Sequence, residues 1–443
     1  MDNTLNHSVL KNFTKYVGLN IIGMISTAIF IFVDYWFVSM AMGTDGLTSL
    51  GLGVPIFNVT FGFGLMLGIG GGARYAYFKA QGEQGRANQI FTTTLKMGCM
   101  IAIPLVLLGS FFATQISMLL GAEYHILPMT AGYIRTLLLL SPGVIFYSIF
   151  EAFARNDEAP KIAMISAVLY NVMNIVLDYT FILVLGWGMV GAALATSLAS
   201  FCALLFLSIN WLRGEVNFRL VKAKIARKQV LSICEIGAPP LLNDLLYGLV
   251  IITFNLTLLN LIGNIGVAAF GIISSIAYVA LFIFIGLGQG IQPLASHYFG
   301  MEDGRRLGKI LKYSIITSVS VAIVVIALVL LFAGSITSIL NYEQDMVLAE
   351  LANIGVRIYF TAFLFAGITI VSVAFLSVTS MPKTALVLSI LRGGALVIPL
   401  ILLLSRLFGV MGVWFAYPLA ELLLVMVSIF CLLRVNRLRK KSL

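Results

Sequence analysis

Residues 68–86 read GIGGGARYAYFKAQGEQGR, and residues 286–305 read GLGQGIQPLASHYFGMEDGR. Five glycines recur 218 residues later, so that Gly53, Gly68, Gly70, Gly72 and Gly82 match Gly271, Gly286, Gly288, Gly290 and Gly300. Displacements of 219 to 222 relate Gly85-Arg86 to Gly304-Arg305, Arg135 to Arg357, Phe153 to Phe375, Pro160-Lys161 to Pro382-Lys383, and Gly188 and Gly191 to Gly409 and Gly412. A register kept along most of two halves predicts an internal duplication.

The composition predicts a membrane protein. The chain of 443 residues is 60% hydrophobic and 10% charged, with a mean hydropathy of +1.03, outside the range of soluble domains. Runs long enough to cross a hydrocarbon layer of about 30 Å as helices cover 15–40, 50–73, 88–112, 130–150, 161–185, 189–211, 237–259, 268–292, 310–333, 353–376, 384–405 and 410–433. These runs are continuously apolar rather than alternating, so we predict an all-α protein with twelve transmembrane helices, six per half.

The first run is longer than the apolar part of a signal peptide and contains Asp34, so we expect it to remain in the mature protein.

The distribution of basic residues predicts the topology. If the N-terminus is cytoplasmic, 24 of the 28 Lys and Arg residues lie in or beside inner segments, as the positive-inside rule requires. We therefore expect a multi-pass protein of the plasma membrane with both termini in the cytoplasm. The net charge of +10 then reflects topology, and we expect no nucleic-acid partner.

An even number of helices per half gives both halves the same orientation, related by a pseudo-two-fold axis along the membrane normal. We predict an N-lobe over residues 1–212, a basic cytoplasmic linker over 213–230 and a C-lobe over 231–443. Substrates of such proteins bind between the lobes.

The sequence lacks the motifs of metal-binding, redox and nucleotide-binding proteins. The four cysteines lie singly, the three histidines are scattered, and there is no His-x-x-Glu-His, Cys-x-x-Cys or phosphate-binding G-x-x-x-x-G-K-[ST] motif. We expect no enzyme activity, no metal centre and no cofactor.

Ionisable residues inside membrane helices are costly and indicate function. Asp34 in the first helix, Asp178 in the fifth and Thr196 in the sixth are predicted to lie at similar depth, about 10 Å from the outer boundary. Asn171 and Asn174 share one helical stripe with Asp178. Two carboxylates close together in a low dielectric favour binding of a proton or a small cation, and oxygen ligands suit H⁺ and Na⁺ equally.

The duplication sharpens this prediction, because the polar positions are not repeated. Asp34 maps to Ile252, Asn174 to Leu396, Asp178 to Leu400 and Thr196 to Tyr417. A purely structural network would be needed in both lobes, so the asymmetry favours function over a buried hydrogen-bond network.

Other polar residues in helices have structural or functional interpretations. Asp244 and Arg392 are predicted to form an ion pair that stabilises the C-lobe, and Glu421 is either a buried hydrogen-bonded acid or a cavity residue that attracts cationic substrates. Tyr35, Tyr170 and Asn171 are further candidates for a substrate cavity, although aromatic residues in membrane helices are more often packing residues or interfacial anchors.

Two stretches resemble signatures of a known family. Residues 33–38 (VDYWFV), followed by Gly43 and by residues 47–55, resemble the first-helix signature of the multidrug and toxic compound extrusion (MATE) family. Residues 174–182 (NIVLDYTFI), followed by residues 188–193 (GMVGAA), resemble its fifth-helix signature. The resemblance covers the whole chain and is greatest to the bacterial DinF-like or MepA-like branch.

The resemblance implies the MATE fold of the MOP superfamily and a monomeric antiporter. Such a protein exports amphipathic, often cationic compounds in exchange for H⁺ or Na⁺ by alternating access. The cation site of the DinF-like branch corresponds to Asp34, Asn174, Asp178 and Thr196. The NorM-like branch has a further acid in its seventh helix, and Asp244 lies one turn closer to the cytoplasm than that position.

The main alternative is a lipid-linked oligosaccharide flippase of the same superfamily, for which basic residues should bind the pyrophosphate. The N-lobe helices carry acids instead. A membrane enzyme would need clustered catalytic residues, and a channel would need a ring of repeated polar residues. We therefore expect small-molecule substrates and the lipid bilayer as partners.

Overall fold

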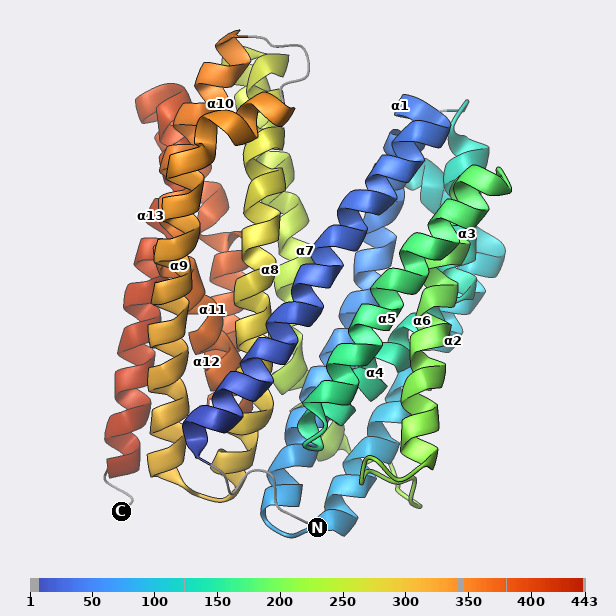
Figure 1. Cartoon of the computed structure of the whole chain (residues 1–443), viewed down its shortest axis with the longest axis vertical. Coiled ribbons are helices and arrows are strands. Elements are labelled where there is room, and N and C mark those ends of the chain that lie inside the picture. Colours follow the sequence, from blue (N-terminus) through green and yellow to red (C-terminus); the bar gives the residue numbers. More distant parts are fainter. Residues whose placement is uncertain (1–7, 123, 341–345, 380, 441–443) are drawn as a thin grey trace. The chain divides into compact units, whose positions relative to one another are not determined.

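The computed structural model describes residues 8–122, 124–340, 346–379 and 381–440, apart from the side chains at 44, 243, 244, 247, 264, 336–340 and 434–440. Every regular element among these residues is helical (Figure 1). Because backbone groups in lipid can be satisfied only within the chain, continuous helices are the expected solution for these apolar runs.

The first half contains six spans. They consist of α1 (Val9–Ala80), α2 (Gln84–Leu119), α3 (Leu127–Leu139), α4 (Ser141–Asn156), α5 (Pro160–Asp178), the π-helix η2 (Tyr179–Val184) and α6 (Gly188–Leu212). A break at Gly43, with φ 58° and ψ −142°, divides α1 into two helices. The fourth span is bent by 47° between α3 and α4, next to Pro142, which disfavours helical geometry in the residue before it.

The second half repeats this pattern. It consists of α7 (Arg227–Ile262), α8 (Asn264–Gly300), α9 (Gly304–Leu340), α10 (Met346–Tyr359), the 3₁₀-helix η3 (Phe360–Ala362), α11 (Phe363–Val378), α12 (Pro382–Ile390), the π-helix η4 (Leu391–Ala395) and α13 (Val397–Lys440). A break at Gly409 divides α13. Gly188 and Gly409, which match in the repeat, have φ of 53° and 60°, a conformation open to glycine at little cost.

The span count confirms the predicted fold. In the described part of the chain, nine helices are long and apolar enough to cross a membrane, and the bent pair α3–α4 makes ten. The stretch Pro382–Leu433 contains the break at Gly409 and provides two spans, and α7, with its apolar part Gly248–Ile262, provides one more. The described residues thus form twelve spans, six in each half, and the chain is a multi-pass membrane protein.

The chain divides into two compact units. Unit 1 contains residues 18–241 and 296–302, and unit 2 contains residues 9–17, 242–295 and 303–443. The unit boundaries therefore fall inside α1, α7 and α8, and the basic stretch 213–230 belongs to unit 1. Each unit has its own apolar core, around Phe91, Phe153 and Phe218 in unit 1 and around Phe254, Phe270 and Trp414 in unit 2.

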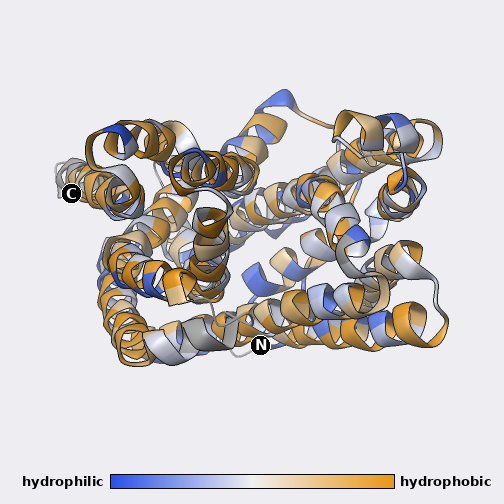
Figure 2. Ribbon diagram, turned by 90° about the horizontal axis from the view of Figure 1, so that it is seen from above, coloured by the Kyte–Doolittle hydropathy of each residue, from blue (hydrophilic) through white to orange (hydrophobic). Residues whose placement is uncertain are grey.

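Most of the ribbon of every helix has the colour of hydrophobic residues (Figure 2). Phe32, Phe111 and Leu331 are 68%, 69% and 77% exposed. The large number of such side chains on the outside of the helices fits a surface that lipid surrounds.

The repeated glycines allow helices to approach closely within each unit. A Cβ atom at Gly70 would lie 2.0 Å from the carbonyl oxygen of Ile233 in unit 1, and one at Gly290 would lie 2.8 Å from the Cα of Val17 in unit 2. Even alanine would force these backbones apart, so the glycine spacing that indicated the duplication has a packing role.

Candidate functional site

Unit 1 brings together the four residues expected to bind a cation. Asp34 lies in the first part of α1, Asn174 and Asp178 lie one turn apart on α5, and Thr196 lies on α6. The side-chain amide of Asn174 donates a hydrogen bond of 3.2 Å to the hydroxyl of Thr196. Asp34 lies close enough to Asp178 for their charges to interact, so α1, α5 and α6 meet at one polar cluster.

Four oxygen atoms of this cluster have no hydrogen-bond partner. Oδ1 of Asp34, both carboxylate oxygens of Asp178 and Oδ1 of Asn174 are buried and accept no hydrogen bond. No ion pair among the described residues includes Asp34 or Asp178. Buried polar atoms are almost always paired in proteins, and a set of free oxygen ligands fits a proton or a hard monovalent cation such as Na⁺.

The helix geometry changes directly after Asp178. The α-helix α5 ends at this residue and continues as the π-helix η2, in which the amide of Leu185 bonds the carbonyl oxygen of Thr180 at 2.9 Å. Short π-helical segments in α-helices occur frequently at functional sites. The segment ends the regular helix at the buried acid.

Asn171 anchors α5 to α1, a contact that the sequence did not reveal. Its amide donates hydrogen bonds to the hydroxyls of Ser26 at 2.6 Å and Thr27 at 3.1 Å. Thr27 and Asp34 are seven residues apart and therefore share one face of α1. This spacing was a signal that could have identified Ser26 and Thr27.

Tyr133 on α3 is a second neighbour that sequence patterns missed. Its side chain is buried, and it lies within range of the charges of Asp34 and Asp178. A Cβ atom at Gly53 would come within 2.3 Å of its ring. Only the packing of the fourth span against α1 identifies this residue, because nothing in its local sequence distinguishes it from other membrane tyrosines.

The candidate cavity residues lie in different environments. Tyr170 is buried and stacks on Tyr147 with ring centroids 5.2 Å apart, Asn171 is buried in the contact with α1, and Tyr35 is 39% exposed. Their contact with a substrate remains a prediction.

The acid Glu421 on α13 forms an ion pair with Arg392 on η4 in unit 2. Arg392 Nε lies 2.8 Å from Glu421 Oε1, and the side chains are 8% and 0% exposed. The predicted partner of Arg392, Asp244, lies on α7, but its side chain is outside the described residues. The Asp244–Arg392 pair therefore remains a prediction.

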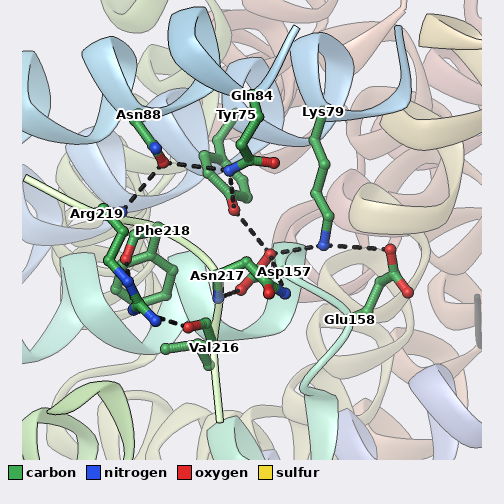
Figure 3. A network of polar contacts seen from close by, with 10 residues as sticks. All are labelled: Tyr75, Lys79, Gln84, Asn88, Asp157, Glu158, Val216, Asn217, Phe218 and Arg219. Atoms are coloured by element: carbon green, nitrogen blue, oxygen red, sulfur yellow. Dashed lines mark hydrogen bonds and ion pairs between the residues drawn. The ribbon is translucent and has the colours of Figure 1, made fainter. Parts of the chain in front are cut away.

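Asp157, at the turn between α4 and α5, is the centre of a second polar network in unit 1 (Figure 3). Its Oδ1 accepts hydrogen bonds from the Tyr75 hydroxyl at 2.7 Å and from Lys79 Nζ at 2.6 Å, and its Oδ2 accepts one from the backbone amide of Asn217. Lys79 also contacts Glu158 at 3.2 Å. Both oxygens of Asp157 are thus paired, unlike those of Asp178.

Among the described residues, no group of three or more His, Cys, Asp or Glu side chains could hold a metal ion.

The duplicated membrane bundle, in which unit 1 contains buried acids without an ion-pair partner, is typical of membrane transport proteins. The sequence model of the MatE family matches residues 20–180 and again residues 239–403, and the chain belongs to this family. The two matches begin 219 residues apart and end 223 residues apart, which confirms the duplication. The protein is a MATE-family transporter and not an enzyme.

Curated relatives extend over most of the chain. The multidrug export protein MepA of Staphylococcus saprophyticus is 28% identical over 94% of this chain and 91% of its own length. MepA of Staphylococcus aureus strain MSSA476 is 28% identical over 90% of this chain and 88% of its own length.

Solved structures share the fold. An outward-facing multidrug resistance MATE family transporter of the MOP superfamily superposes with a TM-score of 0.93 at 20% identity, covering 98% of both chains. A MOP superfamily transporter from Pyrococcus furiosus, described as having a binding pocket of reverse polarity, superposes with a TM-score of 0.91 at 20% identity and the same coverage.

Proposed function

We propose that this protein is a multidrug efflux transporter that exports amphipathic, often cationic compounds in exchange for H⁺ or Na⁺. The observation that carries this proposal is the pair of buried acids Asp34 and Asp178, with three carboxylate oxygens that have no hydrogen-bond partner. Membership of the MatE family and similarity to the MepA multidrug export proteins support the substrate class.

The coupling follows from the energetics of the two acids. A charged Asp at the centre of a membrane helix costs about 2.5–3.5 kcal/mol, and a second negative charge nearby adds repulsion. Binding of a proton or Na⁺ removes most of this cost, so the loaded and empty sites favour different packings of α1, α5 and α6. Exchange between such packings gives alternating access.

We propose the plasma membrane as the location, with both termini in the cytoplasm. The positive-inside distribution of the 28 basic residues supports this topology. The proton or sodium gradient across that membrane would supply the driving force.

Gradient-driven efflux from proteoliposomes tests the proposal. Asp178→Asn keeps the size of the side chain but cannot exchange a proton, so we expect efflux of a fluorescent cationic dye under an imposed pH or Na⁺ gradient to fall at least about tenfold, to the rate of protein-free vesicles. Asp34→Asn should have the same effect. Correct folding is checked by size-exclusion chromatography of the purified variants.

Asp45→Asn is a matched control, because the side chain of Asp45 is 56% exposed and lies outside the cluster; its efflux should equal that of wild type. Wild-type efflux by Asp178→Asn would remove this residue from the mechanism. Gradient-independent movement of a lipid-linked oligosaccharide, together with absence of dye efflux, would favour the flippase instead.

A further inference from the structure

Unit 2 contains a buried ion pair that crosses the same two spans as the acidic cluster of unit 1. Arg392 Nε lies 2.8 Å from Glu421 Oε1, and Arg392 Nη2 lies 3.5 Å from the hydroxyl of Tyr417. Glu421 is fully buried, and its Oε2 accepts no hydrogen bond. The pair thus joins the fifth span of the second half, through η4, to the sixth, through α13.

The internal repeat places these residues beside the counterpart of the unit 1 cluster. Arg392 matches Tyr170, one turn before Asn174, and Glu421 matches Ser200, one turn after Thr196. Tyr417 matches Thr196 itself. In unit 1 the contact between these spans is the hydrogen bond from Asn174 to Thr196. In unit 2 it is the contact from Arg392 to Glu421 and Tyr417.

The two units therefore differ in how the buried acids at these matching sites are neutralised. Asp34 and Asp178 have unpaired oxygens and no described ion pair, whereas Glu421 contacts a guanidinium group of its own unit. A buried ion pair is usually no more stable than a well-packed apolar pair of the same volume. Packing alone therefore gives little reason for a charged pair at this position.

We propose that Glu421 forms a cation site that the guanidinium group of Arg392 occupies permanently. A tethered cation takes the place that an exchangeable H⁺ or Na⁺ takes in unit 1. Arg392 thereby keeps unit 2 out of ion exchange and confines coupling to one half of the molecule. The latter point rests on the proposed function, whereas the occupancy of the Glu421 site by a cation does not.

The repeat also places Asp244 at the counterpart of Ser26, a residue that binds the fifth span in unit 1 through Asn171. The fifth and sixth spans of the second half contribute a guanidinium and an acid, where those of the first half contribute an acid and two neutral polar residues. This arrangement fits a site whose positive charge is covalently supplied.

Chemical rescue tests the inference. Arg392→Ala removes the guanidinium and leaves space for a free cation next to Glu421. We expect the thermal unfolding midpoint of the purified variant in detergent to lie below that of wild type, and to rise by about 3 °C or more with guanidinium or Na⁺ at concentrations far below denaturing ones. Choline chloride at equal ionic strength should have no such effect. The unfolding midpoint of the protein that keeps Arg392 should not rise with guanidinium or Na⁺, because Arg392 already occupies the site at Glu421.

Measurements are made in the Asp34→Asn/Asp178→Asn background, so that cations bound in unit 1 do not contribute. The double change Arg392→Ala/Glu421→Gln should lose the cation response, because the acid that binds the cation is gone. A single Arg392→Ala variant whose midpoint ignores guanidinium, Na⁺ and choline alike would overturn the proposal and leave a purely structural pair.

Arg392→Gln provides a second variant with one remaining hydrogen-bond donor, should the alanine protein fail to accumulate. If neither Arg392→Ala nor Arg392→Gln accumulates, whereas Arg392→Gln/Glu421→Gln folds, then free cations in the cell cannot replace the guanidinium group beside Glu421. This result would likewise overturn the proposal. Because unfolding is measured instead of transport, failure of this inference is distinct from failure of the proposed antiport.

Discussion

Identical carboxylates in unit 1 have different roles according to their partners. Asp157 accepts hydrogen bonds from Tyr75 and Lys79 on one oxygen and from the amide of Asn217 on the other. Asp178 is equally buried but has two unpaired oxygens. Since the protein itself satisfies a paired buried charge, whereas an unpaired one requires a ligand, the partners of each acid, and not its residue type, indicate its function.

At the residue scale, Asp34 and Asp178 should act as one site. We expect Asp34→Asn and Asp178→Asn each to abolish cation binding, and the double variant to be little worse than either single one, because residues that share a ligand are not additive. Tryptophan fluorescence offers a readout, since Trp36 lies two residues from Asp34. Independent losses that multiply in the double variant would contradict a shared site.

The elements of unit 1 are held together at one end by the segment that follows α6. Phe218 packs against the rings of Phe91 and Phe153, with centroids 4.6 Å and 5.9 Å away. Asn88 accepts a bond from the amide of Arg219, and Thr92 accepts one from the amide of Val221, both at 3.1 Å. The stretch expected to be a linker is thus bound to α2 and α4, although residues 213–226 have no regular secondary structure and α7 begins at Arg227.

At the element scale, Asp157→Asn should release this segment. The amide loses the charge that pairs with Lys79, and hydrogen bonds to charged groups contribute about 1.5–3 kcal/mol, so we expect trypsin to cleave within 213–228 about ten- to a hundredfold faster. Timed proteolysis followed by mass spectrometry measures this rate.

Asp303→Asn serves as the control for proteolysis, because Asp303 caps α9 at the amide of Arg306, 2.9 Å away, in unit 2. It should leave cleavage of the segment unchanged. An unaltered rate in Asp157→Asn would show that the aromatic contacts of Phe218 alone hold the segment.

At the scale of the whole molecule, the chain is organised as two repeated halves. Six spans precede the segment 213–230 and six follow it in the described residues, and the family model matches both halves. The halves nevertheless differ at their matching fifth and sixth spans, where unit 1 has an unpaired acid and unit 2 has an ion pair. A duplicated scaffold can thus retain its packing while only one copy keeps the exchangeable site.

The halves should have the same orientation in the membrane. In a protein without native cysteines, reporter cysteines at Tyr124 and Met346, which are 93% and 86% exposed, should react with an impermeant maleimide from outside intact cells. Cysteines at Gln81 and Met301 should react only after permeabilisation. The reverse result for either pair would overturn the topology and the parallel arrangement of the repeats.

Cation and substrate binding should be reciprocally coupled in the whole transporter. If export is an exchange, raising Na⁺ or lowering pH should weaken binding of a cationic substrate, and the substrate should weaken cation binding by the same factor. Equilibrium titrations at several Na⁺ concentrations and pH values measure both factors. A substrate affinity that is constant across all conditions would contradict antiport.

The sequence by itself determined the duplication, the spans and the residue types of the acidic cluster, because helix periodicity and hydropathy are local properties of the chain. It also predicted a similar depth for Asp34, Asp178 and Thr196, since depth follows from the rise per residue. Only the tertiary structure decided which side chains meet across helices: Asn171 with Ser26, Asp157 with Asn217, and Arg392 with Glu421. Such contacts depend on how each helix is rotated about its axis and packed against its neighbours, and that is set by the combined packing of many residues distant in sequence.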